Sequence, residues 1–219
     1  MEDDLIIIPK PDYISWEEIT ELLHTAFAKR VNQGMRFRAA SQDVQTTIEK
    51  VGDGICLVAL LDNKLVGTIT VIYRKVDSKN KKWYHNNSYC YADQLAVHPA
   101  YQKKGIAEKL RAERLKICFE KKVDACILDT SIKAKSLVKL HIDSGFQKVE
   151  LLSSPHTNYY SVRFRLPIYG KEFSKLYVKL RYYYSFIKCR VLKNKYGKYT
   201  MVGKILKKGK EYVRRFKTL

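Results

Sequence analysis

The chain has 219 residues, a length that suits one domain of ordinary size with some residues to spare. Hydrophobic residues make up 46% of it, which is enough for a core. The formal net charge of +20 at pH 7 is far from typical and predicts a partner or surface of opposite sign.

The sequence disfavours three classes of protein: secreted, membrane-spanning, and disulfide-linked or zinc-binding proteins. The N-terminal segment, residues 1–10, is acidic and has a short apolar run, unlike a secretory signal peptide. The longest apolar run, residues 55–61, is too short to cross a bilayer. The five cysteines are odd in number, lack CxxC spacing and lie in apolar stretches, which predicts buried reduced thiols instead of a disulfide framework or a zinc site. We expect a cytoplasmic protein, either soluble or peripheral at the inner face of the membrane.

The first third of the chain predicts strand, helix, helix and hairpin in that order. Residues 5–8 are β-branched and predict a strand. Ser15 and Glu18 have capping-box spacing before a helical apolar pattern, and Ser41 is expected to cap a second, shorter helix. Residues 55–73 then predict a β-hairpin.

The middle of the chain alternates between strands and helices. The remaining predicted elements are a strand at 89–97, a helix at 105–122, a strand at 126–129, a helix at 135–143 stopped by Gly145, and strands at 146–152 and 159–166. This order predicts an α/β fold whose sheet contains one parallel crossover.

The segment "HPAYQKKGIAEKL", residues 98–110, predicts an anion site between a strand and a helix. The first backbone N–H groups of a helix have no partner within it and lie at the positive end of its dipole. A phosphate is stabilised there. Gly105 permits close approach of the backbone, and Lys103 and Lys104 add positive charge at the rim.

The hexapeptide Gln102–Ala107 resembles the [Q/R]xxGx[G/A] loop of the GCN5-related N-acetyltransferases, the GNAT superfamily. The preceding "DQLAVHP" and the later "LHIDSGFQKV", residues 140–149, resemble two further blocks of that family. The resemblance covers residues 5–167 in element order. It implies a mixed, mostly antiparallel central sheet flanked by helices, with a parallel pair of strands that splay apart at the cofactor cleft.

The same resemblance implies acetyl-CoA as the cosubstrate and no metal. Pantetheine is then expected along the backbone of Leu95, Ala96 and Val97. The pyrophosphate is expected on the amides of the loop, which comprises Gln102, Lys103, Lys104, Gly105, Ile106 and Ala107.

Two residues are candidates for proton transfer during direct attack of an amine on the thioester. Asp93 lies on the strand where the family often has an acidic residue. It either acts as the base, binds the substrate ammonium or is a solvated carboxylate at the end of the strand. His141 replaces the tyrosine that often protonates the leaving thiolate; an imidazole can donate this proton, or it can be packed and inert. Tyr159 or Tyr160 is the alternative acid. Ala134 replaces an asparagine that contacts the cofactor in many relatives, so that contact is not expected.

The C-terminal residues 169–219 are expected to form a basic, aromatic-rich extension of the acetyltransferase domain, residues 1–168. Residues 171–219 contain sixteen Lys or Arg and two Glu, and residues 171–190 have the spacing of an amphipathic helix. That helix could pack on the core or on a second copy of the chain. It could instead lie on an anionic membrane or, less favoured, bind nucleic acid.

The sequence therefore predicts an acetyl-CoA-dependent N-acetyltransferase that acts on a primary amine of a small molecule, an amino sugar being one option. The alternatives are a protein or peptide N-acetyltransferase, and a catalytically impaired CoA-binding module with a membrane- or nucleic-acid-binding tail.

Overall fold

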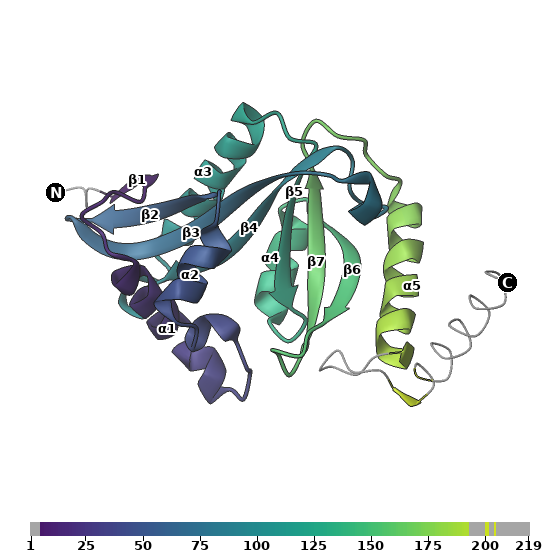
Figure 1. The fold of residues 1–219 in the computed structure, drawn as a ribbon, viewed down its shortest axis with the longest axis horizontal. Helices are drawn as coiled ribbons and strands as arrows, with labels where there is room; N and C mark the ends of the chain where they lie inside the picture. The colour runs from purple at the N-terminus through teal and green to yellow at the C-terminus, as the bar shows by residue number, and fades with distance from the viewer. Residues whose placement is uncertain (1–4, 193–199, 202–203, 205–219) are drawn as a thin grey trace, which may run out of the picture. The chain divides into compact units, whose positions relative to one another are not determined.

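The computed structural model describes residues 5–192, 200–201 and 204 (Figure 1). Its backbone divides into two compact units, one of residues 1–129 with 165–172 and the other of residues 130–164 with 173–219. In chain order the elements are β1 (Leu5–Pro9), α1 (Trp16–Asn32), η1 (Arg38–Ala40), α2 (Val44–Val51), β2 (Ile55–Leu61), β3 (Lys64–Lys75), η2 (Ser78–Asn80), β4 (Ser88–Val97), η3 (Pro99–Tyr101), α3 (Ile106–Glu120), β5 (Ala125–Ser131), α4 (Lys135–Asp143), β6 (Gln147–Ser153), β7 (Tyr160–Pro167) and α5 (Lys175–Leu192).

The strands form a seven-stranded, mostly antiparallel sheet in the order β1-β2-β3-β4-β5-β7-β6. From β1 to β4 each strand is antiparallel to the next, and β4 is parallel to β5. This confirms the predicted mixed sheet with one parallel pair. β5 and β7 each have residues in both units.

The start of α1 confirms the predicted capping box. Ser15 Oγ accepts the Glu18 backbone N–H at 3.1 Å, and Glu18 Oε2 accepts the Ser15 N–H at 2.7 Å. The predicted cap of α2 was wrong, because Ser41 ends η1 with ψ near 10° and so lacks the extended backbone of an N-cap. Asp43 is extended and its Oδ1 accepts the Thr46 N–H at 2.7 Å, so Asp43 caps α2.

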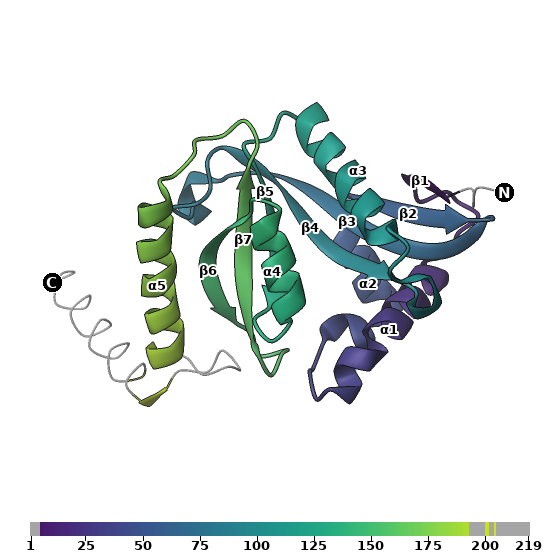
Figure 2. The same ribbon diagram turned by 180° about the vertical axis from the view of Figure 1, so that it is seen from behind.

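Helices cover both faces of strands β1 to β4 in the first unit (Figures 1 and 2). On one face, the α1 residues Ile19 and Leu23 pack with alternate β2 residues such as Val58. On the other face, α3 approaches β3 at Gly67, where an added Cβ would lie 3.1 Å from Leu110 Cδ1. The missing side chain at Gly67 therefore sets how closely α3 packs on the sheet.

In the second unit, α5 lies against β6, and Ser185 Oγ accepts the Leu151 N–H at 3.0 Å. This confirms a helix in the predicted 171–190 segment, while the predicted domain boundary between residues 168 and 169 stays a prediction. All five cysteines are buried and reduced, as predicted. Within the described residues, every helix is too short or too polar to be a membrane span.

Candidate active site

The second half of β4 has one neighbouring strand instead of two. β4 pairs with β3 along its length, but its pairing with β5 runs only from Tyr89 to Ala92. The β3 register passes from Thr70↔Asp93 to Thr68↔Ala96, so β4 has an extra residue in a β-bulge. The β4 backbone from residue 93 to 97 therefore has no β5 partner, and a bound group can pair with its open edge.

The turn after β4 points several backbone N–H groups outward. Lys103 and Gly105 both adopt the left-handed conformation, with φ of 65° and 78°, and α3 begins at Ile106. In the described structure the backbone N–H groups of Lys103 and of residues 105–107 have no hydrogen-bond acceptor within the protein, whereas the Lys104 N–H closes the turn formed by residues 102 and 103. Successive free amides at a helix N-terminus form an anion-binding concavity.

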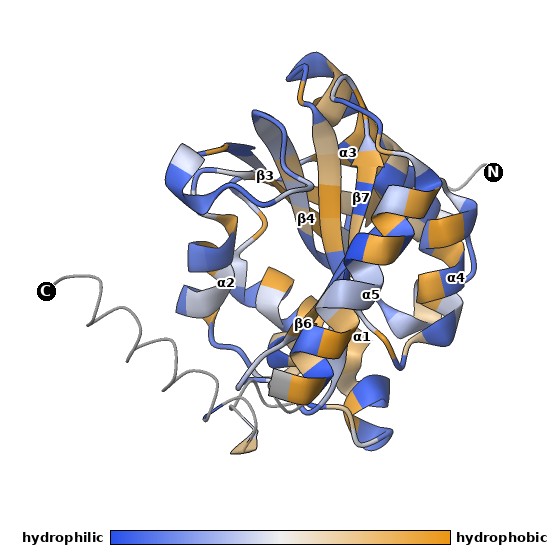
Figure 3. Ribbon diagram, turned by 90° about the vertical axis from the view of Figure 1, so that its right-hand side faces the viewer, coloured by the Kyte–Doolittle hydropathy of each residue, from blue (hydrophilic) through white to orange (hydrophobic). Residues whose placement is uncertain are grey.

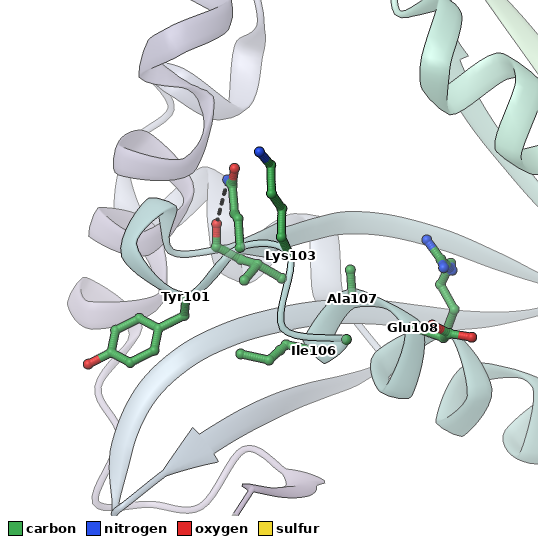
Figure 4. A pocket seen from close by; sticks show the side chains of 9 residues that line it. Tyr101, Lys103, Ile106, Ala107 and Glu108 are labelled. Carbon is green, nitrogen blue, oxygen red and sulfur yellow. Dashed lines mark hydrogen bonds between the residues drawn. The ribbon is translucent and has the colours of Figure 1, made fainter. Parts of the chain in front are cut away.

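The side chain of Gln102 holds this turn in place. Gln102 Nε2 donates to the Val97 carbonyl oxygen at 3.1 Å, the bond drawn in Figure 4. This bond joins the last residue of β4 to the first residue of the hexapeptide. We infer that the Gln102 side chain positions the loop. An anion would then be bound by the backbone N–H groups of the loop and not by this side chain.

The two predicted lysines differ in placement. Lys103 lines a pocket of about 320 Å³ beside the loop. Lys104 does not line it, and its Nζ lies 5.6 Å from the centre of the Tyr101 ring, a cation–π contact. The pocket is lined by Val97, Tyr101, Gln102, Lys103, Gly105, Ile106, Ala107, Glu108 and Arg111 (Figure 4).

Arg111 and Glu108 were not predicted from the sequence. Arg111 is one helical turn after Ala107, and this i,i+4 spacing was the available signal. Burial, and then the neighbouring Arg114 guanidinium, lower the pKa of Arg111, while Glu108 opposes the shift. A bound anion would offset the cost of burying this guanidinium.

Asp93 lies where β4 loses its β5 partner. One carboxylate oxygen, Oδ1, accepts the Gln94 N–H at 2.8 Å, and Oδ2 lies 3.8 Å from Lys50 Nζ of α2. The side chain is 35% exposed, so a substrate can reach it. An ionised carboxylate at this point can accept a proton or hold an ammonium group.

Gln94, in the β4 bulge, is a polar residue that the sequence did not single out. Its φ is 52°, it is 4% exposed, and its Oε1 accepts the Thr70 hydroxyl at 2.8 Å. Among the described residues, Gln94 Nε2 has no hydrogen-bond acceptor. A buried free donor beside Asp93 can bind a polar atom of a ligand.

His141 belongs to the second unit, whereas Asp93 belongs to the first. The His141 ring is 7% exposed and packs on Phe164 and Phe146, with ring centroids 5.2 and 5.7 Å apart. Tyr159, one of the two alternative acids, is also buried, at 6% exposed, whereas Tyr160, the other, is half-buried. Such packing is what we expect if His141 is a packed, inert residue. The role of His141 as the acid stays a prediction.

Residues 16–146 match the family model described as the acetyltransferase (GNAT) family. The match covers more than half of the chain, so the chain belongs to this family. No curated protein sequence matches the chain.

Solved structures share the fold at low sequence identity. A GNAT family acetyltransferase from Elizabethkingia anophelis with acetyl-CoA bound is 12% identical, with a TM-score of 0.55 over 76% of this chain and 100% of that one. Arabidopsis thaliana NAA60, in complex with a bisubstrate analogue, is 18% identical, with a TM-score of 0.56 over 76% and 99%. The ribosomal-protein-S18-alanine N-acetyltransferase from Escherichia coli is 14% identical, with a TM-score of 0.54 over 79% and 99%.

The chain is thus an acyl-CoA-dependent N-acetyltransferase with acetyl-CoA as its cosubstrate. The residues present fit this molecule. The free amides of Lys103 and of residues 105–107 suit its pyrophosphate, Lys103 and Arg111 add positive charge, and the open edge of β4 suits the amide groups of pantetheine.

Proposed function

We propose that this enzyme transfers acetyl from acetyl-CoA to a primary amine, with Asp93 as the base. The observation that carries this assignment is the position of Asp93, a partly exposed carboxylate at the residue where β4 loses β5 and beside its free edge. Pantetheine would run along Leu95, Ala96 and Val97, which places a thioester near this end of the open edge.

In the proposed reaction the amine nitrogen bonds to the acetyl carbonyl carbon. The carbon–sulfur bond breaks, and CoA leaves as its thiolate. Asp93 takes the proton that the amine loses, directly or through a water molecule. The thiolate takes a proton from His141, from Tyr159 or Tyr160, or from solvent. Proton transfer by a positioned base contributes a factor of roughly 10² to 10⁴ to such rates.

The Lys50 side chain supports a fixed carboxylate. Lys50 Nζ lies 3.8 Å from Oδ2, and the Gln94 N–H donates to Oδ1, so both carboxylate oxygens have a partner that holds them in place. The other oxygen, Oδ2, then faces the Lys50 side and the substrate.

Two acceptor classes are compatible with this geometry. We favour a primary amine of a small molecule, an amino sugar being one candidate, in keeping with a basic C-terminal part suited to a membrane-associated substrate. The second class is a protein or peptide amine. It is favoured by two structural neighbours, the Escherichia coli ribosomal-protein enzyme and the NatC complex bound to Gag peptide and CoA.

The test is an amine panel of amino sugars, polyamines and N-terminal peptides, read by release of the CoA thiol. The five protein thiols are buried, so a thiol reagent reports mainly on released CoA. Acetylation of an amino sugar at least tenfold faster than of any peptide supports the small acceptor. The reverse order moves the assignment to the peptide class.

The role of Asp93 is tested by Asp93→Asn, which keeps an oxygen for the Gln94 N–H but removes the base. We expect kcat to fall by roughly a hundredfold or more, with the loss partly reversed at high pH. Asp53→Asn is the matched control, because Asp53 is also ion-paired, to Arg74, but lies in the turn before β2. A rise in KM with unchanged kcat would instead assign Asp93 to holding the substrate ammonium.

A further inference from the structure

Helix α5 has two faces with apolar residues; in the described structure one of them is buried and the other is largely exposed. Val178 and Cys189 are 6% and 7% exposed, and Ser185 on the same face bonds to the Leu151 N–H of β6. This face holds the helix in the second unit. A helix of a globular protein normally carries polar residues on its opposite face.

The opposite face of α5 is apolar and aromatic instead. Seven of its side chains are between 42% and 68% exposed: Leu176, Tyr177, Leu180, Tyr183, Tyr184, Ile187 and Val191. They recur every three or four residues, so they form one stripe along the helix. We call these seven residues the α5 apolar face. Figure 3 shows hydrophobic positions alternating with hydrophilic ones along this helix.

Cations border the α5 apolar face on both sides. By helical spacing, Lys179 and Arg190 lie along one border, and Arg181 and Lys188 lie along the other. The helix has no acidic residue. The Arg190 guanidinium lies 4.5 Å from the centre of the Phe186 ring and 5.6 Å from that of Tyr160 in β7, so it packs toward the sheet, and the two lysines are the cations that extend from the borders.

This arrangement suits an anionic lipid surface better than the other partners. An apolar stripe flanked by lysine and arginine is the pattern of helices that lie in the membrane interface, and tyrosine is enriched at that depth. A second copy of the chain would bring the like charges of the two borders together. Nucleic acid is bound by cations and by aromatic stacking, whereas the centre of this stripe is aliphatic.

We propose that α5 docks this enzyme on the surface of an anionic phospholipid bilayer. The α5 apolar face would lie among the headgroups and upper acyl chains, parallel to the membrane, with Lys179 and Lys188 on lipid phosphates. The remaining positive charge of residues 171–219 adds attraction to the same surface. Acetyl transfer would then take place next to the membrane.

The first experiment is sedimentation of the full chain with vesicles made of equal parts phosphatidylcholine and phosphatidylserine, and with vesicles of phosphatidylcholine alone. The test variant combines three substitutions in the α5 apolar face: Leu176→Ser, Leu180→Ser and Ile187→Ser. The control variant combines three at residues of 42–45% exposure elsewhere: Ile6→Ser, Val31→Ser and Ile142→Ser. All three proteins must show the same thermal shift with acetyl-CoA, which confirms that they are folded.

We expect the wild-type chain and the control variant to bind the anionic vesicles equally. The test variant should lose at least about tenfold in partition coefficient, because three aliphatic side chains no longer enter the interface. Equal binding by the test variant would overturn the proposal, since the attraction would then come from charge outside this face.

A fluorescence reporter separates insertion of α5 from loose electrostatic binding. Tyr184→Trp places the reporter in the α5 apolar face, and Tyr13→Trp, at a position 67% exposed in the first unit, is its control. Subtracting the wild-type spectrum isolates the emission of each reporter from that of the two native tryptophans.

Anionic vesicles should shift the emission of the Tyr184→Trp reporter to the blue, and brominated lipid should quench it, with no change at the control. An unchanged emission would refute docking through α5. A dimer or an RNA complex that needs the α5 apolar face, without vesicle binding, would likewise refute it.

Discussion

The substitution Gly105→Ala adds one methyl group at the loop before α3. It tests separately how the backbone conformation of Gly105 affects stability and how the loop binds acetyl-CoA. The φ of Gly105 is 78°, and an added Cβ would meet no protein atom within 4 Å. Gly105→Ala therefore causes no clash inside the protein. The new methyl group would lie in the pocket beside the free amides that we assign to the pyrophosphate of acetyl-CoA.

Two effects of Gly105→Ala have different sizes. The left-handed conformation costs an alanine about 1 kcal/mol, which lowers the melting temperature of a chain of this size by about 2–4 °C. Loss of one charge-assisted hydrogen bond costs a further 1.5–3 kcal/mol of binding, a factor of about 10 to 100 in Kd. Calorimetric titration with acetyl-CoA measures this second effect directly.

Gly34→Ala is the matched control. Gly34 has a φ of 74° and also has no atom within 4 Å of an added Cβ, but it lies in the turn after α1 and does not line the pocket. Both variants should lose similar stability, and only Gly105→Ala should lose affinity for acetyl-CoA. Equal Kd values for the two variants would refute the assignment of the loop as the pyrophosphate site.

Three further predictions concern the packing of α3 on the sheet, the positive charge of the pocket and the stability of the fold in acid. Gly67→Ala places a Cβ 3.1 Å from Leu110 Cδ1. We expect urea denaturation to show a loss of roughly 1–3 kcal/mol in the free energy of unfolding, and kinetics to show a raised KM for acetyl-CoA. Unchanged values would contradict the close packing of α3 on β3. Arg111→Gln should raise the KM for acetyl-CoA about tenfold with little change in kcat, and should reduce the salt dependence of this KM. An unchanged KM would show that Arg111 does not contribute to the site. Hydrogen bonds from the Ser15 N–H and hydroxyl lower the pKa of Glu18 from 4.5, so its stabilisation is present above that pH and is lost as the pH falls through the folded-state pKa. Urea midpoints of wild type and Glu18→Gln should thus differ at neutral pH and converge in acid, and a constant difference would contradict the lowered pKa.

Local patterns in the sequence predicted the elements that depend on local chemistry. Ser15 and Glu18 cap α1 because both partners lie within one helical turn. Gly105 marks the turn before α3 because its left-handed conformation is rare for other residues. Ser41 and Asp43 are both good caps, and only the backbone angles of the preceding η1 decide between them.

The features that the sequence did not reveal depend on tertiary contacts. The bulge at Gln94 uses a non-glycine residue at positive φ, held by a buried hydrogen bond from Thr70, and no local pattern announces it. Arg111 enters the site only because α3 starts directly at the loop. The exposed residues of the α5 apolar face look from the sequence like an ordinary core-facing stripe, and only the packing of the opposite face on β6 distinguishes them.

Amide chemical shifts of the isotope-labelled chain test the central assignment most directly. Titration with CoA should move the backbone N–H signals of Lys103 to Ala107, together with those of Leu95 to Val97. Titration with pantetheine, which lacks the pyrophosphate, should move only the second group. Unchanged signals from Lys103 to Ala107 at saturating CoA would contradict the assignment of this loop as the site that holds the cosubstrate.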